Sequence, residues 1–210
     1  MSDKQLSWKY AEEFVIERPE IAAARVHASE LGIEAVSPAV GAQLALLAAA
    51  TSAKSIIEVG TGVGISGLWM LSGSPTALLT TIDSELDHQQ VARTVFANAN
   101  IAANRVRQIG GKASEVLPRM NESSYDLVFI DADPHSVIEY VEHGLRLVRP
   151  GGVVAVAHAL WRDRVADPTQ RDATVSNFRS LLREISQSKA VISSLIPVGD
   201  GLLQLTKLSD

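Results

Sequence analysis

Short apolar segments alternate with longer amphipathic segments over most of the chain, and this alternation constrains the fold more than any other feature. The apolar runs predict five strands, at residues 55–59, 78–83, 105–109, 125–130 and 153–157. The segments between and after them predict helices, at residues 64–71, 85–98, 113–120, 137–148 and 177–185. Strands and helices that alternate in this way form a parallel sheet with helices on both faces. The sequence therefore predicts an α/β fold.

The C-terminal part of the chain departs from this alternation. Two further strands are predicted at residues 190–196 and 202–206, with only residues 197–201 between them. A connection that short allows a hairpin but not a parallel crossover. We therefore expect a mostly parallel sheet with one antiparallel strand near its end.

The part of the chain that precedes the first strand has a helical pattern. Pro19 and Pro38 each stand where a helix could begin, and proline is favoured in the first turn of a helix. No repeat or low-complexity linker separates this part from the rest. We expect one domain over residues 1–210, with an N-terminal helical cap at 1–50 and an α/β core at 51–210.

The composition excludes several classes of protein. The chain has no cysteine, which rules out a disulfide scaffold, a thiol nucleophile and a zinc–thiolate site. Its net charge is −5, and it has no Lys/Arg cluster of the kind that binds nucleic acid. The longest apolar stretch, residues 44–50, is too short to cross a membrane, and residues 1–10 lack the apolar core of a signal peptide. We expect a cytoplasmic protein with neither a membrane nor a nucleic-acid partner.

A glycine-rich segment, Glu58-Val59-Gly60-Thr61-Gly62-Val63-Gly64, lies between the first predicted strand and the helix after it. Glycines there allow a sharp turn and the close approach of a ligand, and the helix N-terminus adds free N–H groups. A tight structural turn would use the same residues. The position between strand and helix favours a binding loop, because ligands of open α/β sheets lie at the carboxyl ends of the strands.

Asp83 ends the next predicted strand, about twenty residues beyond these glycines. An acidic side chain at that place can accept hydrogen bonds from both hydroxyls of a ribose. The alternative is a helix N-cap, because a helix follows directly.

Either a nicotinamide cofactor or S-adenosylmethionine (SAM) would fit these two features. Gly62-Val63-Gly64-Ile65-Ser66-Gly67 matches the dinucleotide pattern, but it begins after the strand has already ended. Glu58 would repel a pyrophosphate, whereas it could approach the ammonium group of a methionine. These observations favour SAM, and a nicotinamide-dependent oxidoreductase is kept as the weakest alternative.

Further motifs make the pattern specific, and together they resemble one family. They are Val36-Ser37-Pro38, Glu58 to Ser66, Thr81-Ile82-Asp83, Gly111-Lys112-Ala113, Phe129-Ile130-Asp131-Ala132-Asp133, Arg149-Pro150-Gly151-Gly152 and Gly199-Asp200-Gly201. In this order and spacing, from about Val36 to Lys207, the chain resembles the SAM-dependent catechol and caffeoyl-CoA O-methyltransferases, most closely the bacterial ones.

This resemblance implies a Rossmann-like class I methyltransferase fold with seven strands and a role for each matching residue. It implies that the methionine part of the cofactor is held by Val36, Glu58, Gly60, Thr61 and Ser66. It also implies that Asp83 holds the ribose, that Ala113 lines the adenine pocket and that Asp131 faces the active site and the cofactor. Members of the family are commonly homodimers, and apolar residues near the N-terminus also need a surface that covers them: Trp8, Tyr10, Phe14, Val15 and Ile16.

The chain departs from the family at the metal site. Family members bind a divalent metal with the aspartate at the position of Asp131 and with an Asp-Asn pair after the fifth strand. Here that pair is Ala157-His158, and Pro134 stands where many members carry a lysine base. We therefore assign no metal ligand and do not expect the magnesium mechanism of the family.

His158 follows an apolar strand at the edge where ligands bind. It is either a general base, since imidazole titrates near neutrality, or a soft-metal ligand together with Asp131, or a hydrogen-bonded loop residue. We predict that His158 and Asp131 are the catalytic residues of O-methylation of a small hydroxylated acceptor, with Trp161 able to wall its pocket. The alternatives are a catalytically degenerate SAM-binding protein and a methyltransferase that acts on modified tRNA.

Overall fold

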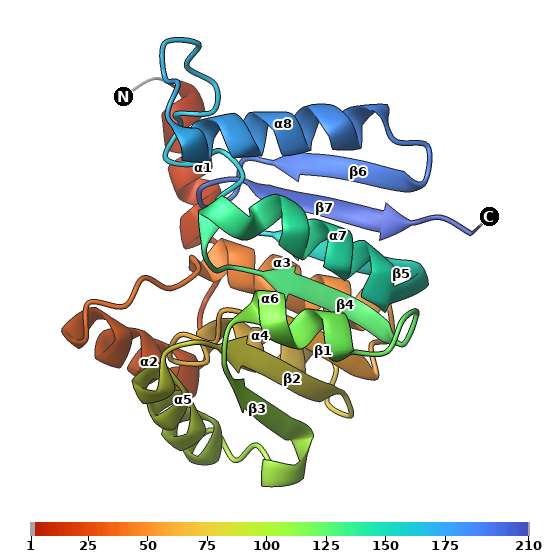
Figure 1. Ribbon diagram of the computed structural model, residues 1–210. Coiled ribbons are helices and arrows are strands. Elements are labelled where there is room, and N and C mark those ends of the chain that lie inside the picture. The colour runs from red at the N-terminus through yellow and green to blue at the C-terminus, as the bar shows by residue number, and fades with distance from the viewer. Residues whose placement is uncertain (1–2, 210) are drawn as a thin grey trace.

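A computed structural model describes residues 3–209, with the side chain of Lys4 left out. Residues 1, 2 and 210 of the expected domain lie outside the described residues. One seven-stranded sheet crosses the molecule in the order β3-β2-β1-β4-β5-β7-β6 (Figure 1). The seven strands are β1 (Ser55–Val59), β2 (Leu78–Asp83), β3 (Val106–Gly110), β4 (Tyr125–Ile130), β5 (Val148–Val156), β6 (Val191–Ile196) and β7 (Leu202–Lys207).

The predicted fold class is confirmed. Strands β1 to β5 pair in parallel, whereas β7 pairs antiparallel with both β5 and β6. β7 follows β6 through a short hairpin, as the spacing of the last two strands predicted. β1 lies between β2 and β4, so the loops after these three strands meet at one edge of the sheet.

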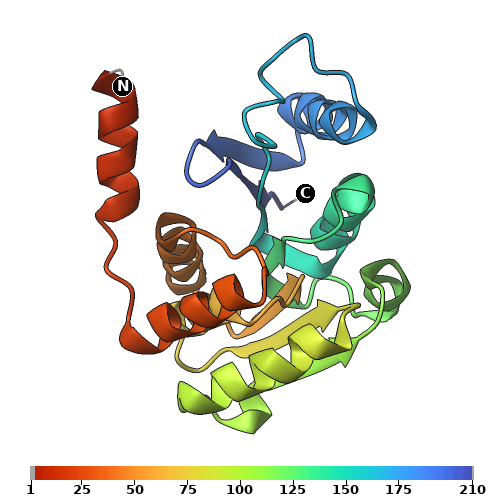
Figure 2. The ribbon, with the colours of Figure 1, turned by 90° about the vertical axis from the view of Figure 1, so that its left-hand side faces the viewer.

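Helices cover both faces of the sheet (Figure 2). They are α1 (Asp3–Glu13), α2 (Pro19–Glu30), α3 (Pro38–Ala50), α4 (Ile65–Gly73), α5 (Leu86–Asn98), α6 (Ala113–Val116), α7 (Val137–Leu147) and α8 (Ala173–Gln187). One apolar cluster joins α2, α3, α4 and α5 to the first face, and a second joins α6, α7 and α8 to the other.

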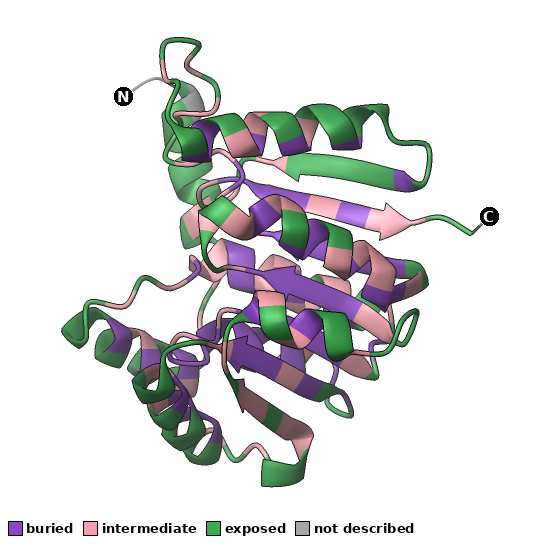
Figure 3. Cartoon of the chain, in the orientation of Figure 1, coloured by how far each residue is buried: buried purple, intermediate pink, exposed green. Residues whose placement is uncertain are grey.

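The central strands are buried on both faces because their side chains alternate between these two clusters. In β1, Ile56 belongs to the first cluster, while Ile57 and Val59 belong to the second. Figure 3 shows β1, β4 and β5 as mostly buried and β6 as mostly exposed. Continuous apolar runs are typical of parallel strands in such a position. None of the helices in residues 3–209 has the length and apolarity needed to cross a membrane.

Several boundaries differ from those predicted. β5 begins at Val148 rather than at 153, and Pro150-Gly151-Gly152 lies inside it at a shift in register rather than before it. The helix predicted at 113–120 ends at Val116 and continues as a 3₁₀ turn. The last helix is longer than predicted, because Asp172 caps it by accepting a hydrogen bond from the Val175 N–H.

The helix α1 was not identified as a separate element, and it stands away from the body of the molecule (Figure 2). Its C-terminal end is anchored by Glu12. The Glu12 carboxylate accepts hydrogen bonds from the Ser37 hydroxyl (2.8 Å) and from the Gly199 N–H (2.5 Å). One charged side chain thus connects α1 to the start of α3 and to the loop between β6 and β7.

Candidate active site

The glycine loop after β1 lies against the chain that leaves β4. Gly60 has a φ of +94°, and a Cβ atom on it would lie 1.8 Å from the carbonyl oxygen of Asp131. Gly62 and Gly64 also have positive φ values. A side chain at Gly60 is therefore excluded by both conformation and space, and glycine lets the loop pack directly on the chain that leaves β4.

Asp83, at the end of β2, holds this loop in place. Its Oδ2 atom accepts hydrogen bonds from the Thr61 N–H (2.9 Å) and the Gly62 N–H (3.0 Å). Its Oδ1 atom accepts one from the Glu85 N–H (2.9 Å), at the start of α5. The helix-cap interpretation of Asp83 and the binding-loop interpretation are therefore both compatible with its position.

Glu58 lies beneath the loop and is completely buried. Its carboxylate accepts hydrogen bonds from the hydroxyls of Ser66 and Thr81, each at 2.6 Å. Thr81 in turn lies 2.6 Å from the hydroxyl of Thr61. Burial raises the pKa of Glu58 to about 7, because desolvation outweighs these hydrogen bonds. Glu58 does not line the pocket, although Thr61 and Ser66 do.

Two adjoining cavities surround the glycine loop and share Gly60 and Ala132. The first, of about 240 Å³, is lined by Glu34, Ala35, Val36, Gly60, Thr61, Gly62, Val63, Ile65, Ser66, Asp131, Ala132, His158 and Trp161. The second, of about 400 Å³, is lined by Val59, Gly60, Ile82, Asp83, Ser84, Gly111, Lys112, Ala113, Ser114, Ala132, Asp133, Ser136 and Tyr140. An elongated ligand could pass over Gly60 from one cavity to the other.

A larger cavity of about 830 Å³ lies between α2 and α5. Its lining includes none of the predicted site residues. The smaller pair of cavities is the better candidate for an active site, since ligands of open α/β sheets bind at the carboxyl ends of the strands.

His158 lies between two carboxylates at the rim of the first cavity. Its Nε2 atom is 3.4 Å from Oδ1 of Asp131, and its Nδ1 atom is 3.2 Å from Oδ2 of Asp200. Burial raises the pKa of Asp131, while the positive charge of a protonated His158 opposes the rise. Asp200 reaches His158 because β7 runs antiparallel beside β5, so the residues before β7 lie next to those after β5.

The turn that carries His158 has an unusual backbone. His158, Trp161, Arg162 and Asp163 all have φ values between 45° and 61°, a region that costs residues other than glycine about 1–2 kcal/mol each. Asp200 supports the turn, since its Oδ1 accepts a hydrogen bond from the Arg162 N–H at 2.6 Å. Strained backbone of this kind is often found at functional sites.

Trp161 in this turn forms part of the pocket wall. Its ring stacks on Phe178 of α8, with 5.6 Å between ring centroids, and meets the His158 ring edge-on at 6.4 Å. Trp161 therefore has the position that the sequence analysis suggested for it, beside both His158 and the cavity.

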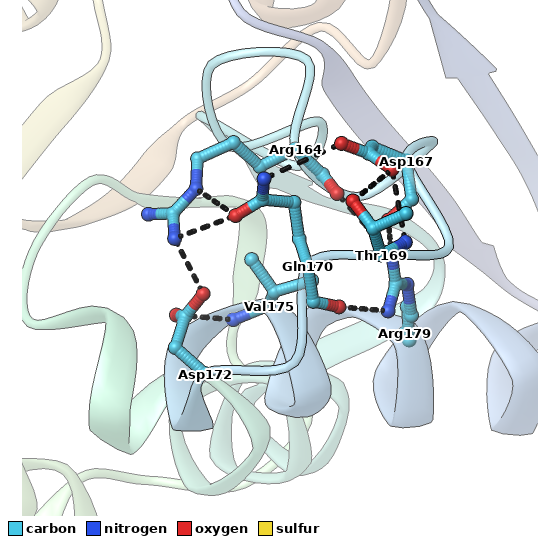
Figure 4. A network of polar contacts seen from close by, with 7 residues as sticks. All are labelled: Arg164, Asp167, Thr169, Gln170, Asp172, Val175 and Arg179. Atoms are coloured by element: carbon cyan, nitrogen blue, oxygen red, sulfur yellow. Dashed lines mark hydrogen bonds and ion pairs between the residues drawn. The ribbon is translucent and has the colours of Figure 1, made fainter.

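The loop that follows Trp161 is fixed by a polar network (Figure 4). Arg179 of α8 donates hydrogen bonds to four main-chain carbonyls of the loop, those of Arg164, Val165, Asp167 and Gln170. Arg164 donates to Gln170 and to Asp172. These bonds attach the loop between Trp161 and α8 to the helix that carries Arg179.

The structure brings together most of the residues that were predicted for the site. Val36, Gly60, Thr61, Ser66, Asp131 and His158 line the first cavity, and Asp83 and Ala113 line the second. From the sequence, Thr81 was given no role of its own, and Asp200 was considered only as a carboxylate that could contribute to a metal site. The sequence signal that could have identified Asp200 is the turn Gly199-Asp200-Gly201 before the antiparallel strand.

The donor set at His158 does not fit the magnesium site of the resembled family. No group of three or more His, Cys, Asp or Glu residues within residues 3–209 is arranged to hold a metal ion. Asp131 and Asp200 each face a ring nitrogen of His158 instead of a common centre. Magnesium prefers six oxygen ligands in nearly octahedral geometry, which this arrangement does not offer.

Comparisons with known proteins identify the family of this chain and its fold. A family model described as O-methyltransferase matches residues 9–208. A Mycobacterium avium protein named "Putative O-methyltransferase" is 49% identical over 92% of this chain and 88% of its own. The O-methyltransferase TomG from Streptomyces achromogenes, solved with SAM, is 28% identical with a TM-score of 0.87 over 100% of both chains. A Bacillus cereus O-methyltransferase, solved with S-adenosylhomocysteine (SAH), is 26% identical with a TM-score of 0.84 over 96% of this chain and 97% of that one.

Proposed function

Because this chain belongs to the O-methyltransferase family, we propose that it transfers the methyl group of SAM to a hydroxyl oxygen of a small acceptor, with His158 as the base. The observation that carries this proposal is the position of His158 between Asp131 and Asp200 at the rim of the cavity beside the glycine loop. The acceptor is proposed only as a small hydroxylated molecule.

The paired cavities fit the cofactor. Val36, Gly60, Thr61 and Ser66 would hold its methionine part, with Glu58 acting from behind, and Asp83 and Ala113 would hold its adenosine part. The missing Cβ of Gly60 lets the loop pack directly on the Asp131 carbonyl, and Gly60 lies in the wall that the two cavities share. When bound, SAM supplies a methyl group on a sulfonium, which needs no further activation.

The protein must then orient the acceptor and remove its proton. A phenolic hydroxyl has a pKa near 10 and keeps its proton at neutral pH. In the neutral imidazole whose Nδ1–H donates to Asp200, the Nε2 atom carries no proton and can accept that of the acceptor at the rim of the cavity. Asp131 lies 3.4 Å from Nε2 and would stabilise the imidazolium that forms.

We also propose that the reaction needs no magnesium ion. The replacement of the Asp-Asn pair by Ala157-His158 leaves Asp131 as the one carboxylate retained from the family pattern. Nitrogen is a poorer ligand than oxygen for a hard cation. The base function that a metal would assist is assigned here to His158.

A homodimer is proposed from the surface of α1. Tyr10, Phe14 and Ile16 are all more than 70% exposed, and Leu6 and Trp8 are also exposed. Leu6, Trp8 and Tyr10 lie on α1, which stands off the body, and Phe14 and Ile16 lie in the segment that follows it. Apolar residues gathered in this way indicate a surface covered in an assembly. Light scattering should give twice the mass of the chain, and a monomer mass at high concentration would contradict the proposal.

Calorimetry tests whether the cavities bind the cofactor. SAM and SAH should both bind in the micromolar range, and no heat at millimolar ligand would overturn the proposed function. Gly60→Ala should abolish binding, because the new Cβ would overlap the Asp131 carbonyl. Gly32→Ala is the matched control: its φ is also positive, at +68°, but no atom lies within 4 Å of its Cβ position.

A further inference from the structure

Glu58 belongs to a chain of four side chains that reaches the pocket without Glu58 itself touching it. Ser66 and Thr81 each lie 2.6 Å from one of its carboxylate oxygens, and Thr61 lies 2.6 Å beyond Thr81. All four residues are buried, and Ser66 and Thr61 line the cavity proposed for the methionine part of SAM. The charge of Glu58 therefore acts on the pocket through hydroxyl groups.

The number of protons in this chain fixes the direction of each hydrogen bond. An ionised carboxylate only accepts, so the hydroxyl protons of Ser66 and Thr81 both point toward Glu58. The proton between Thr81 and Thr61 must then come from Thr61. In this state Ser66 and Thr61 present only lone pairs to the pocket, and both can act there only as acceptors.

A neutral Glu58 reverses the direction of one or two of these hydrogen bonds. Its own proton is donated either to Ser66 or to Thr81. In the first case the Ser66 proton is free to point into the pocket. In the second case Thr81 donates to Thr61, and the Thr61 proton becomes free. Either way, one hydroxyl at the pocket wall becomes a donor.

The other residues of the pocket indicate which protonation state of Glu58 favours binding of the ligand. The described residues that line it include two carboxylates, Glu34 and Asp131, but no lysine or arginine. The ammonium group of a methionine can pair with those carboxylates. Apart from the rings of His158 and Trp161, the groups that can donate to its carboxylate are main-chain N–H groups and hydroxyls, so the ligand gains a hydrogen bond when a hydroxyl donates.

We propose that Glu58 takes up a proton when SAM binds, so that Ser66 or Thr61 can donate a hydrogen bond to the carboxylate of the ligand. Glu58 is thus a positioning residue that acts through two hydroxyls. This inference rests on the proposed function and adds a proton to the binding reaction.

The surroundings of Glu58 support a carboxyl group that changes charge near neutral pH. Its pKa is raised to about 7 by burial, against the effect of Ser66 and Thr81, and the charges of Asp131 and Asp83 raise it further. Four helices pack on this face of the sheet, and two of them, α3 and α4, contain no charged residue. The arginines of the other two, Arg25 of α2 and Arg93 of α5, bond to Glu17 and Gln108. The charges that act on Glu58 are those of carboxylates, and no cation is among them.

Calorimetry in buffers of different ionisation enthalpy measures the protons taken up on binding. At pH 8, SAH should bind with an uptake that approaches one proton, and its affinity should fall by up to about tenfold per pH unit above neutrality. 5′-Methylthioadenosine, which lacks the amino-acid end, should bind without this uptake. Equal uptake for the two ligands would overturn the proposal, and this comparison needs no variant.

The variant Glu58→Gln tests whether the proton taken up on binding goes to Glu58 or to another titratable group at the site. Glutamine keeps an acceptor and a donor for the two hydroxyls, as the neutral carboxyl does. The variant should bind SAH without the uptake seen in the wild type, and uptake that persists would overturn the proposal. If SAH does not bind the wild type at all, the proposed function fails instead, and the two failures are distinguishable.

Discussion

The Nδ1 atom of His158 lies 3.2 Å from Oδ2 of Asp200, although 42 positions separate the two residues in the chain. The contact exists because β7 runs antiparallel beside β5. It directs the other ring nitrogen of His158 toward Asp131 and the cavity. In the proposed mechanism this pair replaces the metal and the lysine base of the resembled family.

His158→Gln should lower kcat by roughly 10²- to 10⁴-fold, the usual contribution of a general base. The affinity for SAH should change little, since the proposed contacts of the cofactor are made by other residues. His27→Gln is the matched control, because His27 lies on the exposed side of α2 and lines neither cavity of the site. An unchanged kcat in His158→Gln would contradict the base role.

Asp200→Asn should lower kcat by up to roughly 10⁴-fold, the loss found when an amide replaces the carboxylate that orients a general-base histidine. An asparagine amide can turn its NH₂ group toward Nδ1, which favours the tautomer with the proton on Nε2. The pH profile of kcat should shift, whereas a purely structural role would lower the melting temperature and leave the profile in place. Both readouts are therefore needed.

Asp83→Ala should weaken SAH binding by roughly 10²- to 10⁴-fold, because the two charge-assisted hydrogen bonds to the ribose contribute about 1.5–3 kcal/mol each. The structure adds an expectation about stability. Three main-chain N–H groups, those of Thr61, Gly62 and Glu85, lose their acceptor. The free energy of unfolding should fall by about 1–3 kcal/mol.

Asp87→Ala is the control for Asp83→Ala, since Asp87 lies in the first turn of α5 and is exposed. A variant at Asp83 that loses stability but binds SAH with unchanged affinity would show that Asp83 only caps α5 and holds the loop.

Glu58 should make the stability of the fold depend on pH. Its pKa rises from an ordinary 4.5 in the unfolded chain to about 7 in the folded one. At pH values between 4.5 and 7, Glu58 holds its proton more strongly in the folded chain than in the unfolded one. The free energy of unfolding therefore decreases as the pH rises from 4.5 through 7. The full difference is about 3 kcal/mol.

Glu58→Gln should remove this dependence. In urea denaturation, the free energy of unfolding of Glu58→Gln minus that of the wild type should increase as the pH rises from 5 to 8. The value of this difference at pH 5 does not affect the test. Glu142→Gln, on the exposed side of α7, should follow the wild type. A difference between Glu58→Gln and wild type that stays constant over this range would contradict the assigned pKa.

Much of the fold could be predicted because it depends on local patterns. The apolar runs, the glycines after β1 and the short gap before β7 gave the parallel sheet and its antiparallel strand, and the motifs gave the family. α1 was missed because residues 1–10 are mostly polar, and the start of β5 was misplaced because Pro150-Gly151-Gly152 normally ends an element.

The contacts inside the site could not be predicted in the same way. Asp200 meets His158 only through the pairing of β5 with β7, and the hydroxyl of Thr81 meets Glu58 only through the register of β1 and β2. The sequence analysis placed Glu58 against the ammonium of the ligand. The structure instead places it behind Ser66 and Thr81, which is why its role is proposed through those hydroxyls.

Transfer of labelled methyl from SAM into fractionated cell extract, before and after exhaustive chelation, tests the central claim most directly. The account predicts a labelled small molecule whose rate of formation is unchanged by chelation and falls strongly with His158→Gln. Loss of transfer on chelation, with recovery only on adding magnesium, would contradict the metal-free mechanism. SAH binding without any labelled product would contradict the proposed activity and favour a degenerate cofactor-binding protein.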